Sequence, residues 1–186
     1  PIARSVRGLH ADGWPTRDLR ICAVRARDAR RVVFGTAGAP LTDVGTAVAA
    51  SCAIPAYFRP VTIDGAAYVD GGVHSPTNAD VLLGEGFDLV LVLSPMSLSR
   101  SGRRPPIDLA LRLAVRRYLA AEVRKLRRAG TRVVVVQPGP DDLLSMGVNP
   151  MRGTGVEQVL ATVGGSVTER LAVQPEVRAL LSTATG

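Results

Sequence analysis

The sequence has few of the residues that mark disulfide-stapled, zinc-binding or base-stacking proteins. Its 186 residues include only two cysteines, Cys22 and Cys52, which excludes a disulfide framework, and neither belongs to a CxxC or Cys/His cluster that would indicate zinc. Both lie in apolar segments, so we expect both to be small core residues, and a reducing compartment is compatible with this usage. Three Phe, three Tyr and one Trp supply little surface for stacking bases, so nucleic acid is not an expected partner.

Long hydrophobic runs are also missing. No apolar run reaches the ~18 residues that a membrane-spanning helix needs. The first ten residues lack the apolar core of a signal peptide. The composition, 46% hydrophobic and 21% charged, is that of a globular chain rather than a disordered one. The length suits one domain, and we expect a cytoplasmic or peripheral membrane location.

Positive charge is in excess, with a net charge of +7 at neutral pH. Much of it falls in a helix predicted over 107–129, whose apolar stripe includes Val115 and Leu119. Two interpretations stay open. The cations could contact an anionic membrane or a phosphate group, or they could form the solvated face of a crossover helix whose C-terminus favours positive charge. The cations in question are Arg112, Arg116, Arg117, Arg124, Lys125, Arg127 and Arg128.

The first half of the chain predicts strands joined by short turns. The segments 18–26 and 30–36 read as one hairpin, and 60–73 reads as a second one around the Asp64-Gly65 turn. The Ala-rich segment 41–53 is expected to form a helix with Thr42 or Asp43 as its N-cap. A helix is also predicted over 77–87, with Thr77 or Asn78 as its cap.

The second half predicts a strand–helix–strand unit. The apolar runs 88–95 and 131–138 are typical of strands buried on both faces of a parallel sheet, with helix 107–129 between them. We therefore expect an α/β fold with a mainly parallel central sheet, incomplete because two buried strands make too small a sheet. Two closing helices are predicted over 155–172 and 175–184, and an exposed loop over 99–106. The segment 137–142 is predicted to be a plain loop; the alternative is that its two acids contribute to a pocket or bind a cation.

Asp70 is the main candidate for chemistry. It follows Tyr68 and Val69 at the predicted end of a strand, and Gly71 and Gly72 come directly after it. Catalytic groups gather at strand ends, a carboxylate there can act as a general base, and glycines permit a sharp turn and close approach of another group. The alternative is a simple Asp-Gly turn, and these residues alone leave both interpretations open.

Other nucleophile arrangements have less support. His74 and Ser75 are neighbours on an extended segment and point to opposite faces, so they do not form a Ser–His–Asp triad with Asp70. No G-x-S-x-G motif occurs in the 186 residues. Ser51 and Cys52 lie in a helix of small residues without a basic partner nearby in sequence, and we interpret them as packing residues.

Taken together, "LTDVGTAVAASCAIPAYFRPVTIDGAAYVDGGVHSPTNADVLLGEGFDLVLVLSP" resembles the patatin-like phospholipase family. An Ala/Ser-rich helix ends in Pro, and an aromatic-x-Pro, a hairpin, the D-G-G motif, an Asn and a buried strand then follow in the family's order. Residues 18–34 look like the preceding hairpin, and 145–171 like the family's tail. The resemblance implies that residues 1–186 are the C-terminal portion of one acyl hydrolase domain with a three-layer fold, whose N-terminal part of the sheet is missing.

The resemblance also implies a mechanism. The family uses a Ser–Asp dyad without metal or cofactor, and its base corresponds to Asp70, with Gly71 and Gly72 as motif glycines. The serine and the glycine-rich oxyanion loop have no counterpart here and would lie upstream of residue 1, so the chain alone is expected to be inactive. The implied substrate is a lipid acyl ester. The alternative is a non-catalytic module, an inactive paralogue that binds anionic membranes or phosphate.

Overall fold

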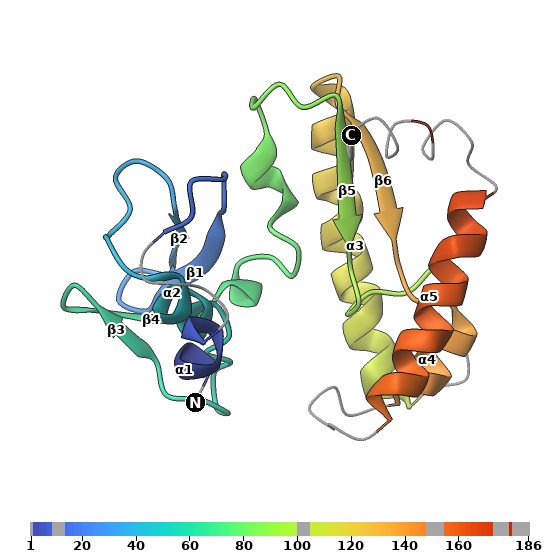
Figure 1. Cartoon of the computed structure of the whole chain (residues 1–186), viewed down its shortest axis with the longest axis horizontal. Helices are drawn as coiled ribbons and strands as arrows, with labels where there is room; N and C mark the ends of the chain where they lie inside the picture. The colour runs from blue at the N-terminus through green and yellow to red at the C-terminus, as the bar shows by residue number, and fades with distance from the viewer. Residues whose placement is uncertain (1, 9–13, 100–104, 148–154, 173–178, 180–186) are drawn as a thin grey trace. The chain divides into compact units, whose positions relative to one another are not determined.

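The computed structural model describes residues 2–8, 14–99, 105–147, 155–172 and 179. These form two compact units, Pro1–Asn78 and Ala79–Gly186, and each is described by itself (Figure 1). Unit 1 holds α1 to η1, and unit 2 holds η2 to α5.

Unit 1 is built on a four-stranded antiparallel sheet with the order β2-β1-β4-β3. The predicted hairpins are both present, with shorter strands than the sequence pattern suggests. The Asp64-Gly65 turn has positive φ at both residues, 47° and 70°, as a two-residue turn of the primed type requires. The strands are β1 (Ile21–Arg25), β2 (Arg30–Phe34), β3 (Val61–Ile63) and β4 (Ala66–Asp70).

The helix α2 (Val44–Ser51) packs its small residues against this sheet. Ala47 and Ala50 are fully buried, beside the rings of Phe34 and Tyr68, which meet edge to face with centroids 5.4 Å apart. Small side chains let a helix approach a sheet closely, and the aromatic pair fills the remaining space. The core of unit 1 therefore lies between α2 and the central strands.

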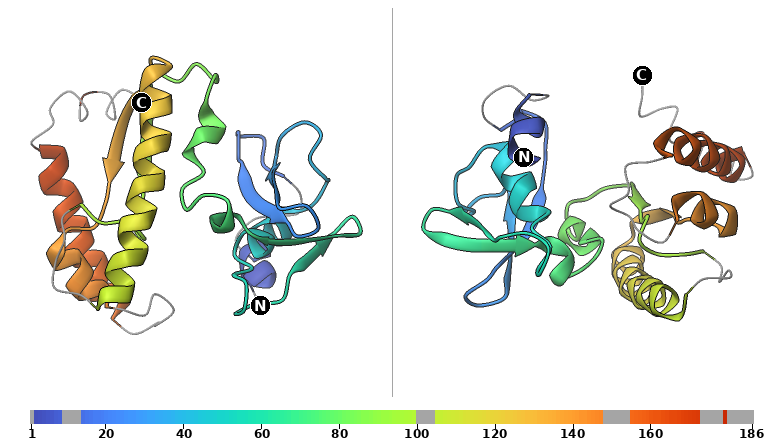
Figure 2. Two further views of the ribbon diagram at one scale, coloured as in Figure 1. Left: turned by 180° about the vertical axis from the view of Figure 1, so that it is seen from behind. Right: turned by 90° about the horizontal axis from the view of Figure 1, so that it is seen from below.

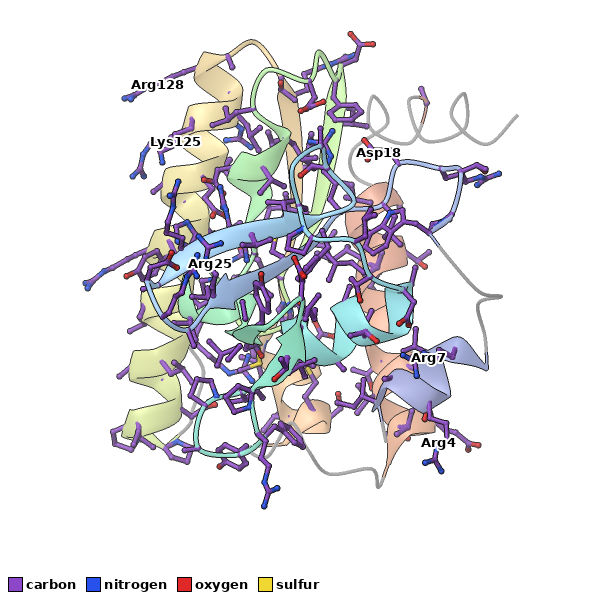
Figure 3. All side chains as sticks on the ribbon, turned by 90° about the vertical axis from the view of Figure 1, so that its left-hand side faces the viewer. Arg4, Arg7, Asp18, Arg25, Lys125 and Arg128 are labelled. Atoms are coloured by element: carbon purple, nitrogen blue, oxygen red, sulfur yellow. The ribbon has the colours of Figure 1, made fainter. Side chains whose placement is uncertain are left out.

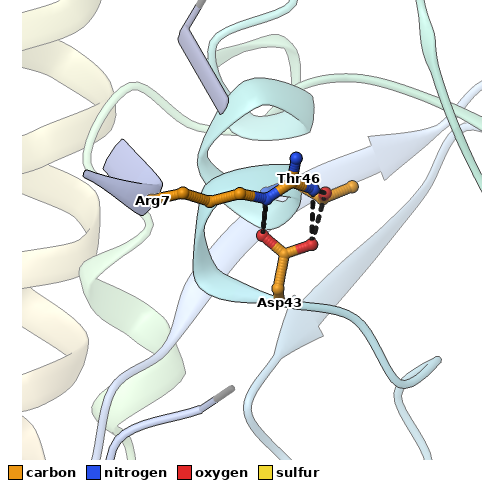
Figure 4. Close-up of polar contacts among 3 residues, drawn as sticks. All are labelled: Arg7, Asp43 and Thr46. Atoms are coloured by element: carbon orange, nitrogen blue, oxygen red, sulfur yellow. Dashed lines mark hydrogen bonds and ion pairs between the residues drawn. The ribbon is translucent and has the colours of Figure 1, made fainter. Parts of the chain in front are cut away.

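Asp43 is the N-cap of α2, one of the two residues that the sequence proposed for it (Figure 4). Its Oδ1 accepts a hydrogen bond from the Thr46 backbone N–H at 3.0 Å. Arg7, on the short helix α1 (Ile2–Arg7), donates from Nε and Nη2 to the two carboxylate oxygens at 2.9 and 2.8 Å. Arg7 and the bonds from Thr46 hold the pKa of Asp43 well below its usual range. The ion pair thus joins α1 to α2.

Unit 2 contains the predicted strand–helix–strand unit. The strands β5 (Leu89–Leu93) and β6 (Arg132–Val136) pair in parallel, and α3 (Pro106–Arg128) connects them. Buried residues of α3, among them Leu119 and Leu126, cover one face of the strands, while α4 (Pro140–Met146) and α5 (Val156–Ala172) lie on the other side (Figure 2, right). Helices therefore flank both faces of this small sheet.

The sheets correct the expectation of a mainly parallel central sheet. Among the strands in the described residues, only β5 and β6 are parallel, and the other four are antiparallel. The reason is the length of the connections: short turns join β1 to β2 and β3 to β4, whereas parallel strands need a long crossover. The expectation that the second-half strands are buried on both faces is also wrong, because Leu91 and Leu93 are 41% and 65% exposed.

Two further element predictions were wrong. The helix predicted over 77–87 is only a single 3₁₀ segment, η2 (Ala79–Leu82), because Gly84 and Gly86 adopt positive φ values of 81° and 76°, which end helical structure. The loop predicted over 137–142 instead opens α4 at Pro140, a residue type suited to the first helical turn. Helix 155–172 is confirmed as α5; helix 175–184 and most of loop 99–106 fall outside the described residues.

Candidate active site

Asp70 is the last residue of β4, a central strand of the unit 1 sheet. It pairs with Ala23 of β1, and its backbone N–H donates to the carbonyl oxygen of Ala53, just beyond α2, at 3.0 Å. The residue is half-buried. The backbone of Asp70 is therefore held from both sides, by the neighbouring strand and by the segment that follows α2.

The side chain of Asp70 caps the 3₁₀ turn η1 (Gly71–Val73). Its Oδ1 accepts the backbone N–H of Gly72 at 2.7 Å. Within the part of the chain that the structure describes, no hydrogen bond or ion pair reaches Oδ2. The turn interpretation and the base interpretation are thus compatible, because the turn orients one oxygen and leaves the other available to accept a proton.

The two glycines have different physical roles. Gly71 is buried, and a Cβ atom there would lie 2.4 Å from the carbonyl oxygen of Cys22, so only glycine fits. A Cβ atom at the exposed Gly72 would lie 3.0 Å from Oδ1 of Asp70 and would press on the carboxylate. The sequence predicted that these glycines permit another group to approach closely. At Gly71, the group that approaches is the β1 backbone at Cys22.

Asn78 fixes the loop that follows Asp70, a role the sequence interpretation missed. Its Nδ2 donates to the carbonyl oxygens of Gly71 and Ser75 at 3.2 and 2.5 Å, and its Oδ1 accepts from Nη1 of Arg31 at 3.2 Å. From the sequence, Asn78 was one of two candidates, with Thr77, for the cap of the helix predicted over 77–87. The φ of Asn78 is 49°, in the left-handed region, which asparagine tolerates better than most residues. The asparagine at this position was therefore the sequence signal that could have predicted a loop rather than a helix cap.

His74 and Ser75 have different environments and different structural roles. Ser75 is buried, and its Oγ accepts the backbone N–H groups of Asn78 and Thr77 at 3.2 and 3.4 Å. His74 is exposed and ends the η1 turn. The buried hydroxyl thus serves the loop conformation.

The cysteines differ from the expectation that both are core residues. Cys22 is half-buried in β1, whereas Cys52 is exposed and caps the C-terminus of α2, beyond the packed face of the helix. Although Cys52 is exposed as a whole, partial shielding of its thiol from water raises its pKa, and the negative charge of Asp70 raises it further. A raised pKa lowers the thiolate fraction and hence the reactivity of this thiol.

The helix α3 presents its cations as predicted, with one exception. Arg112 is only 2% exposed, because its guanidinium donates to the carbonyl oxygens of Pro95 and Ser97 at 2.9 and 3.1 Å and pairs with Asp108. It is a structural residue and not part of the surface. The exposed cations, of which Lys125 and Arg128 are visible in Figure 3, are Arg116, Arg117, Arg124, Lys125, Arg127 and Arg128.

Neither a metal centre nor a membrane span is found in the described ranges. No group of three or more His, Cys, Asp or Glu side chains that could hold a metal ion occurs among these residues. Within the same ranges, no helix combines the length and the apolar character needed to cross a bilayer.

Comparison with known proteins relates unit 1 to a family. Residues 11–83 match the family model described as patatin-like phospholipase. The matched segment includes β1 to β4, α2 and the Asp70-Gly71-Gly72 motif. No curated protein matches the chain. The family resemblance of unit 1 is therefore shown over this segment, and the wider resemblance of the chain stays a prediction.

Proposed function

We propose that residues 1–186 are the C-terminal portion of a serine acyl hydrolase that acts on lipid esters, and that Asp70 is the general base of its Ser–Asp dyad. The observation that carries the proposal is the geometry of Asp70: a backbone held by β1 and Ala53, one oxygen fixed by Gly72, and the family match around it. The serine lies outside these residues.

In the proposed reaction, Asp70 takes the proton of the serine hydroxyl as the serine oxygen attacks the ester carbonyl. The tetrahedral oxyanion collapses, protonated Asp70 gives its proton to the departing alkoxide, the alcohol leaves, and an acyl–serine ester remains. Asp70 then takes a proton from water, whose oxygen attacks the acyl group. The second oxyanion collapses, the serine oxygen leaves and takes the proton back from Asp70, and the fatty acid is released. Backbone N–H groups supplied with the serine would hold the oxyanion, an interaction worth roughly 10²–10³ in turnover.

Apolar surface near Asp70 supports a lipid substrate. Val73, three residues after Asp70, is 55% exposed, and Ile54 follows the Ala53 carbonyl that binds the Asp70 amide and is 37% exposed. Tyr57 is 76% exposed on the same segment. Exposed apolar side chains beside a held carboxylate suit a substrate with an acyl chain.

The serine assignment can be tested by covalent labelling. A fluorophosphonate reacts with an activated serine, so the full-length gene product should be labelled at one serine, in a G-x-S-x-G motif outside residues 1–186, with loss of p-nitrophenyl ester hydrolysis. Peptide mass spectrometry identifies the site. Purified residues 1–186 alone should remain unlabelled and inactive. Labelling of Ser51 or Ser75, or turnover by residues 1–186 alone, would contradict the assignment.

A second candidate function is binding to an anionic membrane surface without catalysis. The specific observation is that Arg116, Arg117, Arg124, Lys125, Arg127 and Arg128 are all exposed on α3. On the same helix Ile107, Leu111 and Tyr118 are 83%, 53% and 57% exposed. Cations beside exposed apolar residues are the composition of helices that lie at a membrane interface. This function is compatible with catalysis and could also stand alone.

A further inference from the structure

Unit 2 contains a cavity of about 440 Å³ that the proposed hydrolase mechanism does not use. One wall is formed at the carboxyl ends of β5 and β6, where Leu93 and Val136 line it. The opposite wall is α5, whose Val159, Val163 and Val167 recur at intervals of four residues and so lie on one helix face. The size is within the range of small-molecule sites.

The lining is mainly apolar, and part of it is in contact with water. Leu93 and Leu160 both line the cavity, and they are 65% and 67% exposed. Covering such side chains with an apolar ligand is favourable in proportion to the area removed from water. The cavity therefore favours a hydrocarbon chain.

A polar pair in the lining indicates the head group. Ser166 on α5 donates from Oγ to Oδ1 of Asp142 at 2.6 Å, and Oδ2 of Asp142 accepts the backbone N–H of Gly139 at 2.7 Å. Asp142 is 2% exposed. Because the Ser166 O–H donates to the carboxylate, the Ser166 oxygen can accept a hydrogen bond from a ligand hydroxyl. The nearby carboxylate disfavours an anionic head group.

We propose that this cavity binds a neutral single-chain amphiphile, an unbranched alkyl chain with a hydroxyl head. The chain lies along the valine face of α5, and the hydroxyl donates to Ser166 Oγ. This site does not depend on the proposed dyad, because every residue that forms it belongs to unit 2.

Calorimetric titration of the purified chain with decan-1-ol tests the site. We expect saturable binding of one molecule per chain. Val163→Trp fills the cavity and should weaken binding at least tenfold, whereas Ala161→Trp, an exposed position on the same helix outside the lining, should bind like the wild type. Leu160 lines the cavity but is exposed, so its replacement by Glu should not unfold the chain. Leu160→Glu should also weaken binding of decan-1-ol.

The head group is tested with decanoate at the same pH. We expect decanoate to bind at least tenfold more weakly than decan-1-ol, and Asp142→Asn to narrow that difference. Absence of saturable decan-1-ol binding would overturn the site. So would wild-type affinity in both Val163→Trp and Leu160→Glu, and equal affinity for decanoate and decan-1-ol would overturn the hydroxyl assignment.

Discussion

Two aspartates of unit 1 occupy similar local positions but are held very differently. Asp43 caps α2, and Arg7 and Thr46 bond both of its oxygens. Asp70 caps the η1 turn through one oxygen, which accepts only the Gly72 amide among the described residues. An ion-paired carboxylate is a poor base, because the cation stabilises its charge. At the scale of residues, this difference supports the proposed role of Asp70 as the base and gives Asp43 a structural role.

The Arg7–Asp43 pair should make stability depend on pH. Because Arg7 lowers the pKa of Asp43 in the folded chain, the pair stabilises the fold above the unfolded-state pKa of about 3.9 and loses this effect as pH falls below it. Arg7→Ala should lower the free energy of unfolding at pH 7 by about 0.2–1 kcal/mol. The loss of unfolding free energy caused by Arg7→Ala should shrink toward zero at strongly acidic pH.

Urea unfolding of the chain at several pH values, followed by circular dichroism, measures this effect. Arg4→Ala is the matched control, since Arg4 is exposed on the same helix α1. A cost for Arg7→Ala that is the same at neutral and at strongly acidic pH would show that the ion pair is not the cause.

At the scale of elements, the helices and turns that strong local sequence signals determine were predicted correctly. The Asp64-Gly65 turn, the Asp43 cap and the apolar stripe of α3 each identify an element with little influence from the rest of the chain. The 77–87 segment failed because its apolar spacing suggested a helix, while its two glycines set the actual backbone. The mainly parallel sheet was wrong because it extended the character of the two apolar runs 88–95 and 131–138 to the whole chain, whereas short turns join β1 to β2 and β3 to β4.

Side-chain partners were harder to predict than elements. Arg112 has the same sequence context as its basic neighbours. It is nevertheless buried, because its guanidinium donates hydrogen bonds to the carbonyl oxygens of Pro95 and Ser97. Asn78 accepts a hydrogen bond from Arg31, which is 47 residues away in sequence. In the candidate site, Asp70 and its glycines could be proposed from the sequence, but contacts made across the fold could not be predicted from it.

The basic face of α3 leads to a prediction about membranes. The chain should sediment with vesicles that contain phosphatidylglycerol and not with pure phosphatidylcholine vesicles, and salt raised from about 0.05 to about 0.5 M should release it. Each cation near an anionic surface contributes about 1 kcal/mol. Arg117→Glu, Arg124→Glu and Arg128→Glu combined should therefore weaken binding by roughly 10²-fold or more.

The control for this experiment changes the charge equally elsewhere. Arg17→Glu, Arg27→Glu and Arg59→Glu combined reverse three exposed arginines of unit 1. If both triple variants lose binding to the same extent, net charge and not α3 attracts the chain to the vesicles. Binding that ignores lipid charge and salt would also contradict the role of α3.

At the scale of the whole molecule, the chain divides its proposed tasks between two units. Unit 1 carries the held carboxylate and the family match, and unit 2 carries the basic helix and the apolar cavity. The net charge of +7 favours contact with anionic surfaces, where lipid esters are found. In the proposed hydrolase, the base and the apolar residues beside it belong to unit 1, and the further lipid contacts are proposed on α3 and at the cavity of unit 2.

The most direct test of the central claim is the turnover of the full-length gene product with Asp70→Asn, measured on a p-nitrophenyl acyl ester. The control is Asp64→Asn, which changes the exposed turn aspartate of the same β3–β4 hairpin and should leave turnover within about twofold. Loss of the base should lower turnover by at least about 10²-fold in a folded protein. Turnover close to that of the wild type in a folded Asp70→Asn variant would contradict the account.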